Sequence, residues 1–224
     1  MCEILVVTGA APRTFSTVVD SARSMEYYGS ANFGWGVAWL ENGRVEHYRS
    51  VGRLRDEADA AERLGPIEST HFLVHFRRPS KLSTIQMADT QPFLDEGHAL
   101  AFAHNGRFVE EAEYRPTYAD HLLGAADSEV GFAMFQDLLA AGAPMGEALE
   151  TVHSKLGGRA NLVAMDSDGR VALYSSYEGN RLWTFRDGDA MMAATELHSP
   201  DGSLFDLIFP NATKRRVVEG SGTL

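Results

Sequence analysis

The chain has 224 residues, of which 44% are hydrophobic and 23% charged, and its 20 basic and 31 acidic side chains give a formal net charge of −11. This length and apolar fraction predict a folded chain with a sizeable core rather than a disordered one. The acidic balance argues against nucleic acid as a main partner. The single cysteine, Cys2, excludes an intramolecular disulfide and a thiolate metal cage.

Hydrophobic patterning predicts strands and helices in the following order. The run 3–8 predicts a buried strand, and 15–28 has apolar residues at helical spacing. Asn42-Gly43 between the runs 34–40 and 44–49 predicts a hairpin. Later strands are expected over 71–76, 99–104, 162–166, 170–175, 182–185 and 191–195, and later helices over 56–64, 128–140 and 145–156.

This order predicts an α+β fold, because the helices are grouped apart from mostly antiparallel strands. We expect a single domain over 1–224, with the polar, Gly-rich segment 211–224 forming a flexible tail. No apolar run is long enough to cross a bilayer, and no positively charged leader precedes the first strand. We therefore expect a cytoplasmic protein without membrane contact. Trp35, Trp39 and the run 204–209 are expected in the core, and a subunit interface in a homo-oligomer is the alternative.

Four histidines form one candidate metal site. His71 and His75 share one strand face, and His98 and His104 follow along the chain. Strand histidines usually satisfy a hydrogen bond, and zinc requires at least three ligands. We therefore predict no metal.

Cys2 is the candidate nucleophile. Removal of the initiator methionine before a residue as small as cysteine would leave Cys2 as the amino terminus. An α-amine with a pKa of about 7.7–8.0 would then lie beside a thiol of about 8.5, so one residue would hold both nucleophile and base. The alternative is that Cys2 is an arbitrary second residue.

Three further segments place polar or charged groups that could bind a substrate at the ends of predicted strands and helices. The Asn105 amide beside the Gly106 N–H can hold a developing oxyanion, although Asn-Gly also forms turns. Arg77 can bind a carboxylate with its planar fork, and its alternative is a surface arginine at a strand end. Asp127 begins a helix, where it would cap the helix or bind an ammonium group.

These segments resemble one family in their order and rough spacing. The chain is similar to a class II glutamine amidotransferase domain over most of its length. That resemblance implies an N-terminal-nucleophile hydrolase with a four-layer αββα sandwich of two mostly antiparallel sheets. The segments that carry it are Met1-Cys2, the glycine-punctuated stretch 28–39, His75-Phe76-Arg77, Thr90-Gln91-Pro92-Phe93, Ala103-His104-Asn105-Gly106 and Asp127-Ser128-Glu129.

The resemblance implies a role for each residue. Cys2 would attack the side-chain amide carbon of glutamine, and Asn105 with the Gly106 N–H would form the oxyanion hole. Arg77 would pair with the substrate α-carboxylate and Asp127 with its α-ammonium. Ammonia would leave first, and water would then release glutamate without any cofactor.

The chain departs from the family pattern at three places. Arg77 is followed by Arg78-Pro79-Ser80, so Ser80 would keep the family's hydroxyl, as a substrate-binding residue, while its glycine is missing. Gln91 stands where histidine is frequent, and Glu3 stands where glycine often follows the cysteine. These departures bear on substrate choice more than on the nucleophile.

Three functional alternatives follow from the resemblance. A separate synthetase subunit would accept the ammonia, since 224 residues leave no room for an attached one. Alternatively, the chain is a stand-alone γ-glutamyl conjugate hydrolase, like the hydrolase of ergothioneine synthesis. The third alternative is a non-catalytic ligand-binding or regulatory subunit on the same scaffold.

Overall fold

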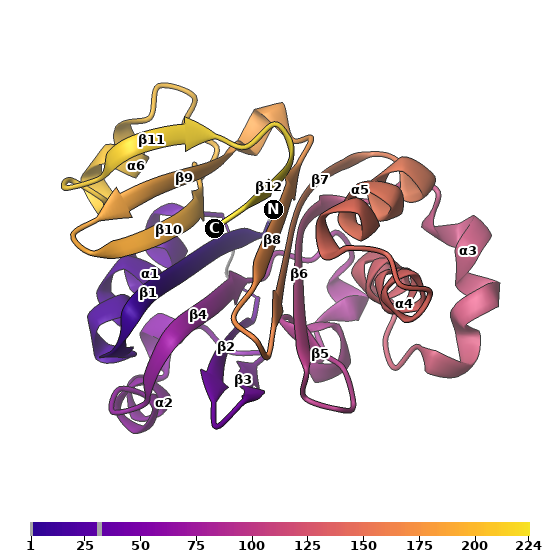
Figure 1. Ribbon diagram of the computed structural model, residues 1–224, viewed down its shortest axis with the longest axis horizontal. Coiled ribbons are helices and arrows are strands. Elements are labelled where there is room, and N and C mark those ends of the chain that lie inside the picture. The colour runs from indigo at the N-terminus through magenta and orange to yellow at the C-terminus, as the bar shows by residue number, and fades with distance from the viewer. Residues whose placement is uncertain (1, 31–32) are drawn as a thin grey trace.

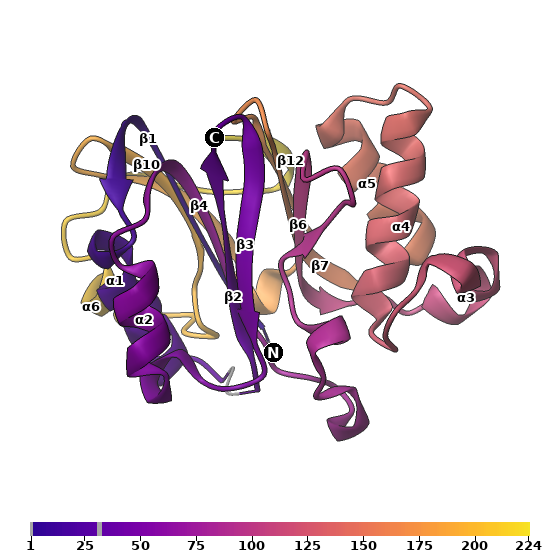
Figure 2. The same cartoon turned by 90° about the horizontal axis from the view of Figure 1, so that it is seen from below.

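A computed structural model describes residues 2–30 and 33–224 of the chain. Met1, and Ala31 and Asn32 of the glycine-punctuated stretch, lie outside the described residues. Two antiparallel sheets pack face to face, with α1, α2 and α6 covering one outer face and α3, α4 and α5 the other (Figures 1 and 2). The predicted α+β fold with four αββα layers is confirmed.

The larger sheet has seven strands in the order β11-β9-β10-β1-β4-β2-β3, and the smaller has five in the order β12-β8-β7-β6-β5. The strands are β1 (Glu3–Thr14), β2 (Trp35–Glu41), β3 (Arg44–Ser50), β4 (Glu68–Phe76), β5 (Phe93–Leu94), β6 (Leu100–Arg107), β7 (Arg159–Asp166), β8 (Val171–Ser175), β9 (Leu182–Asp187), β10 (Ala190–Thr195), β11 (Thr213–Val217) and β12 (Gly220–Thr223). The helices are α1 (Ser16–Tyr28), α2 (Ala58–Leu64), α3 (Glu111–Tyr118), α4 (Asp127–Ala140), α5 (Met145–Leu156) and α6 (Ser203–Ile208). Short 3-10 turns are η1 (Leu54–Asp56), η2 (Leu82–Thr84), η3 (Met87–Asp89), η4 (Ala119–His121) and η5 (Glu178–Asn180).

The position of β1 at the centre of the larger sheet explains why this strand is apolar at consecutive positions. Ile4 and Val6 face the opposite sheet, whereas Leu5 and Val7 face the helices, so both faces are buried. The layer between the sheets consists largely of alanine, valine, leucine and isoleucine side chains, which allow close approach. Trp35 and Trp39 lie in the core beneath the helices, as predicted.

The prediction of a flexible tail over 211–224 is wrong. The segment forms β11, which pairs with β9, and β12, which pairs with β8 in the other sheet. Backbone pairing to an open sheet edge requires no apolar side chains, so polar residues along β11 do not prevent it. The segment therefore runs along an edge of both sheets.

The described helices include none that is both long and apolar enough to cross a bilayer.

Candidate active site

The predicted site residues meet at one end of the two sheets. Cys2 immediately precedes β1, and Arg77 immediately follows β4, which pairs with β1 so that Glu3 lies opposite Phe76. Asn105 and Gly106 lie near the end of β6, and Asp127 begins α4. Segments distant in sequence are thus joined because their strands end at the same edge of the sandwich.

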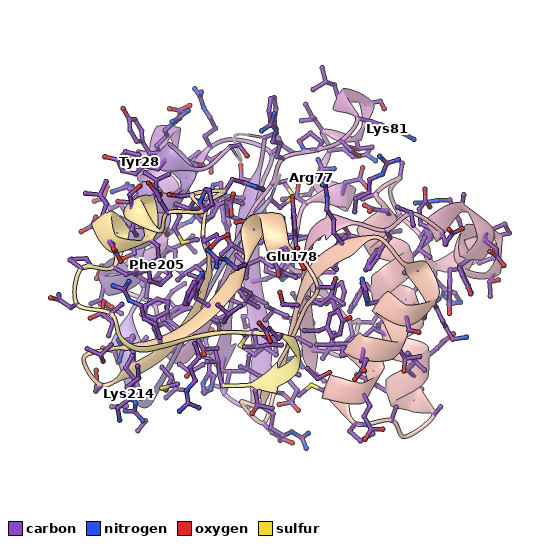
Figure 3. All side chains as sticks on the ribbon, turned by 90° about the horizontal axis from the view of Figure 1, so that it is seen from above. Tyr28, Arg77, Lys81, Glu178, Phe205 and Lys214 are labelled. Carbon is purple, nitrogen blue, oxygen red and sulfur yellow. The ribbon has the colours of Figure 1, made fainter. Side chains whose placement is uncertain are left out.

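A cavity of about 880 Å³ opens at this edge. Cys2, Arg77, Ser80, Gly106 and Asp127 all line it. In Figure 3, which views the molecule from above, Arg77 lies between Tyr28 at the end of α1 and Lys81. A second cavity, of about 920 Å³, lies at the opposite end of β6 and is lined by none of the predicted catalytic residues.

Cys2 is partly exposed and faces the cavity. Its Sγ accepts a hydrogen bond from the Arg78 N–H at 3.3 Å. Burial raises the pKa of the Cys2 thiol, and the Arg78 N–H and the Arg77 charge offset only part of this effect. Because the thiol is not acidified by its surroundings, a base must accept its proton before it can act as a nucleophile.

Asn105 is fully buried directly beneath the cavity. Its Oδ1 accepts a hydrogen bond from Asn161 Nδ2 at 3.2 Å. Its own Nδ2 is buried and has no hydrogen-bond partner within residues 2–30 and 33–224. An unpaired buried donor costs about 1–3 kcal/mol, so this amide is poised to bind an acceptor brought by a ligand.

The orientation of the Asn105 amide is fixed by residues that the sequence did not reveal. Asn161 Nδ2 also donates to the Asn180 carbonyl at 2.7 Å, and Asn161 Oδ1 accepts from Ser175 Oγ at 2.7 Å. With both its donor and its acceptor engaged, Asn161 presents only Nδ2 to Asn105. An asparagine among the buried apolar residues 160–165 of strand β7 was the one available signal.

Gly106 occupies a position that requires glycine. Its φ is +151°, and a Cβ there would lie 2.0 Å from the carbonyl oxygen of Arg159. A side chain at this position would push β6 away from β7 and displace the neighbouring Asn105. The Gly106 backbone can therefore serve the cavity only if the residue stays glycine.

Arg77 is held by a hydroxyl that the sequence did not single out. Its guanidinium is buried and donates to the carbonyl oxygen of Thr84 and to Thr84 Oγ1, the latter at 2.8 Å. Ser80 lies at the exposed mouth of the cavity. Thr84, in η2, is thus the residue that positions Arg77, and only the folding of the 78–84 segment reveals this.

Asp127 also lines the cavity, from the first turn of α4. Its carboxylate accepts hydrogen bonds from the Phe108 N–H at 2.8 Å and from the Ser128 N–H at 3.0 Å. These two donors fix the position of the carboxylate. The cavity therefore contains one buried cation and one ordered carboxylate, the pair that a zwitterionic amino acid requires.

The wall beside Asp127 is held by a second, buried carboxylate. Asp89 Oδ1 accepts hydrogen bonds from the N–H groups of Ala125 and Ala126, at 2.8 and 2.6 Å. Gln91, where the family often has histidine, is also buried and accepts from the His104 N–H at 2.6 Å. Both side chains anchor backbone next to the cavity.

Glu3 lies beneath the site, on the other face of β1 from Cys2. Its Oε2 accepts hydrogen bonds from Asn180 Nδ2 at 3.0 Å and from Thr195 Oγ1 at 2.5 Å. Burial raises the pKa of Glu3 to about 7, although these two hydrogen bonds act in the opposite direction. Its Oε1 lies 3.8 Å from His198 Nε2.

The described residues contain no group of three or more His, Cys, Asp or Glu side chains that could hold a metal ion.

The sequence comparison identifies the family. A family model described as glutamine amidotransferases class-II matches residues 1–204. The chain belongs to this family. No curated protein matches the chain.

Solved structures share its fold. A glutamine phosphoribosylpyrophosphate amidotransferase from B. subtilis aligns with a TM-score of 0.75 at 17% identity, covering 100% of this chain and 49% of that one. A glutamine aminotransferase class-II domain protein from Silicibacter pomeroyi aligns with a TM-score of 0.60 at 20% identity, covering 87% and 88% of the two chains. A predicted glutamine amidotransferase from Pseudomonas aeruginosa aligns with a TM-score of 0.52 at 17% identity, covering 87% and 83%. The chain therefore spans about half of the B. subtilis enzyme, and at these identities the likeness concerns the fold.

Proposed function

We propose that this class II glutamine amidotransferase hydrolyses the γ-glutamyl amide of glutamine through a thioester on Cys2, with Cys2 as the mature amino terminus. The observation that carries the proposal is the Asn105 amide, whose buried Nδ2 has no partner among the described residues while its Oδ1 is held by Asn161. A donor fixed in this way next to Gly106, which lines the same cavity as Cys2, fits an oxyanion hole.

The proposed reaction uses groups that already lie in or beneath the cavity. Arg77 pairs with the substrate α-carboxylate and Asp127 with its α-ammonium, which directs the side-chain amide towards Cys2. The free α-amine of Cys2 takes the thiol proton as Sγ attacks the amide carbon. The Asn105 Nδ2–H and the Gly106 N–H stabilise the oxyanion that forms.

Collapse of this intermediate breaks the carbon–nitrogen bond. The Cys2 ammonium returns its proton to the departing nitrogen, so ammonia leaves and a γ-glutamyl thioester remains. Water, deprotonated by the same amine, attacks the thioester and releases glutamate and the thiol. All protons are accounted for by one amine, and the chemistry needs no cofactor. The ammonia is released to solvent or to a separate synthetase subunit.

A second candidate substrate class is γ-glutamyl conjugates larger than glutamine. Cavities of about 300–1,000 Å³ take drug-sized ligands, and this one measures about 880 Å³. Free glutamine fills only a small part of that volume, which favours a substrate with a larger leaving group.

The first test is intact-mass measurement of protein made in cells. We expect a mass without Met1, because the mechanism requires the free amine of Cys2. Full retention of Met1 refutes the proposed catalysis.

The second test is covalent trapping with an electrophilic glutamine analogue. The chain contains one cysteine, so a thiol adduct can form only on Cys2. We expect stoichiometric labelling of the wild type, none of Cys2→Ala, and release of glutamate and ammonia from glutamine by the wild type alone. A wild type that binds glutamine but is neither labelled nor active supports the non-catalytic ligand-binding alternative instead.

A further inference from the structure

We propose that Arg107 and Arg159, together with Arg78, form a subsite for an anionic group, a carboxylate or a phosphate, on the leaving amine of a γ-glutamyl amide. The inference rests on the proposed function and extends it to the substrate class. Its starting point is the pairing of β6 with β7, in which Arg107 lies directly opposite Arg159.

Two arginines opposite each other in an antiparallel pair have their side chains on the same face of the sheet. Like charges in this arrangement repel each other and destabilise the pairing. No carboxylate of residues 2–30 and 33–224 lies within ion-pair distance of either arginine. An anion bound between the two side chains would relieve the repulsion.

The charge of the cavity lining also favours an anionic ligand. In the described part of the lining, cations outnumber carboxylates, although the chain as a whole has a net charge of −11. The cations are Arg77, Arg78, Lys81, Arg107 and Arg159, and the carboxylates are Glu111 and Asp127. Glu111 is already paired with Arg115 at 2.9 Å. After the α-carboxylate and α-ammonium of a γ-glutamyl group are bound, a surplus of positive charge remains.

The position of the arginine pair relative to the oxyanion hole fits the leaving group. The pair Asn105–Asn161 lies two residues inward from Arg107–Arg159 along the same strands and on the same face. Two strand residues span about 7 Å. The departing nitrogen is bonded to the carbon whose oxygen Asn105 would hold, so a substituent a few bonds long reaches the arginines.

Arg78 and the ring of Tyr177 complete the subsite. The Arg78 N–H binds the Cys2 sulfur, which places this residue beside the bond that breaks. The guanidinium of Arg159 lies 5.1 Å from the centre of the buried Tyr177 ring, a contact that restrains it at the mouth of the cavity. Burial lowers the pKa of His198, and the charges of Arg159 and Arg78 lower it further, which is consistent with both lying on one side of the cavity.

The experiment compares four substrates: glutamine, γ-glutamylethylamide, γ-glutamylglycine and the γ-glutamyl amide of 2-aminoethyl phosphate. The wild type should have a kcat/KM for at least one anionic amide about tenfold or more above that for the neutral ethylamide. Whichever of the glycine and phosphate derivatives has the higher kcat/KM identifies the anion that the subsite prefers. The preference should shrink in high salt because the arginines are exposed.

The double variant Arg107→Gln, Arg159→Gln should reduce the ratio of anionic to neutral kcat/KM to below about threefold. The ratio cancels any general loss of activity. Arg186→Gln is the matched control, because Arg186 is an exposed strand arginine outside the cavity lining and should leave the ratio unchanged.

The two proposals fail in different ways. If the wild type hydrolyses glutamine without preferring an anionic amide, or if the preference survives in the double variant, the subsite is refuted and the proposed function stands. If no γ-glutamyl amide, glutamine included, is hydrolysed, the proposed function is refuted and the subsite inference with it.

Discussion

Replacing Glu3 with glutamine tests whether a buried, titrating carboxylate underlies the site. Glu3 is 0% exposed, and the polar groups around it are Asn180, Thr195, Glu196 and His198. Glutamine has the same shape as glutamate, and its carbonyl oxygen can accept the hydrogen bonds from Asn180 and Thr195. The substitution therefore removes the titration while it preserves the packing.

The pKa shift of Glu3 sets the size of the expected change in the free energy of unfolding. Its pKa is raised from 4.5 to about 7 in the folded protein, so the folded state binds this proton more tightly than the unfolded state. The stability that this proton confers is fully present below pH 4.5 and is lost as the pH rises through 7. Linkage gives a loss of about 2.5 kcal/mol between pH 5 and pH 8 from this group.

The assay is urea unfolding of wild type and Glu3→Gln at several pH values from 5 to 8. As the pH rises from 5 to 8, the free energy of unfolding of the variant should increase by about 2.5 kcal/mol relative to that of the wild type. The difference between their urea midpoints should change by about 1 M. The comparison is made as a difference because His75, whose pKa is lowered to about 3 by burial, destabilises both proteins as the pH falls below 6.5.

Glu219→Gln, which changes an exposed carboxylate, is the control and should run parallel to the wild type. If the Glu3→Gln curve also runs parallel to the wild type from pH 5 to pH 8, Glu3 does not titrate in this range and the reasoning is refuted.

Three further substitutions test the positions of the site groups. Asn161→Leu removes the donor that orients Asn105, so kcat for glutamine should fall towards the roughly 10²–10³-fold expected for a lost oxyanion donor, with a small change in KM; an unchanged kcat contradicts the orienting role. Gly106→Ala puts a side chain at φ +151° against a backbone carbonyl, so the protein should lose about 2 kcal/mol or more, measured by thermal unfolding; an unaltered midpoint contradicts this. Thr84→Val keeps the shape but removes the hydroxyl that accepts from Arg77, so KM for glutamine should rise by about fivefold with kcat little changed; a fall in kcat alone would contradict a binding role.

Local sequence signals predicted the elements well where the signal and the structural cause coincide. The β-branched run at 3–8 became the centre of β1 because both of its faces are buried. Asn42-Gly43 formed the expected turn because both residues have positive φ. The helix predicted over 145–156 has those bounds, because its apolar spacing and the glycines that follow it both indicate a helix that ends at Leu156.

Contacts between distant segments could not be predicted from local signals. β11 and β12 carry no apolar pattern, and their order comes from backbone pairing with strands already in place. The sequence singled out Ser80 in the segment after Arg77, whereas the fold of that segment brings the Thr84 hydroxyl to the Arg77 guanidinium. The catalytic roles of Cys2 and Asn105 stay predictions that the experiments above address.

The arrangement also shows why the site depends on the packing of the two sheets. Glu3 belongs to the larger sheet and Cys2 immediately precedes it, whereas Asn105 and Asn161 belong to the smaller one. Asn180 bridges them, since its side chain donates to Glu3 and its carbonyl accepts from Asn161. The distance between Cys2 and Asn105 is therefore set by this bridge and by the small side chains between the sheets. Substitutions in that layer should alter catalysis without touching the cavity.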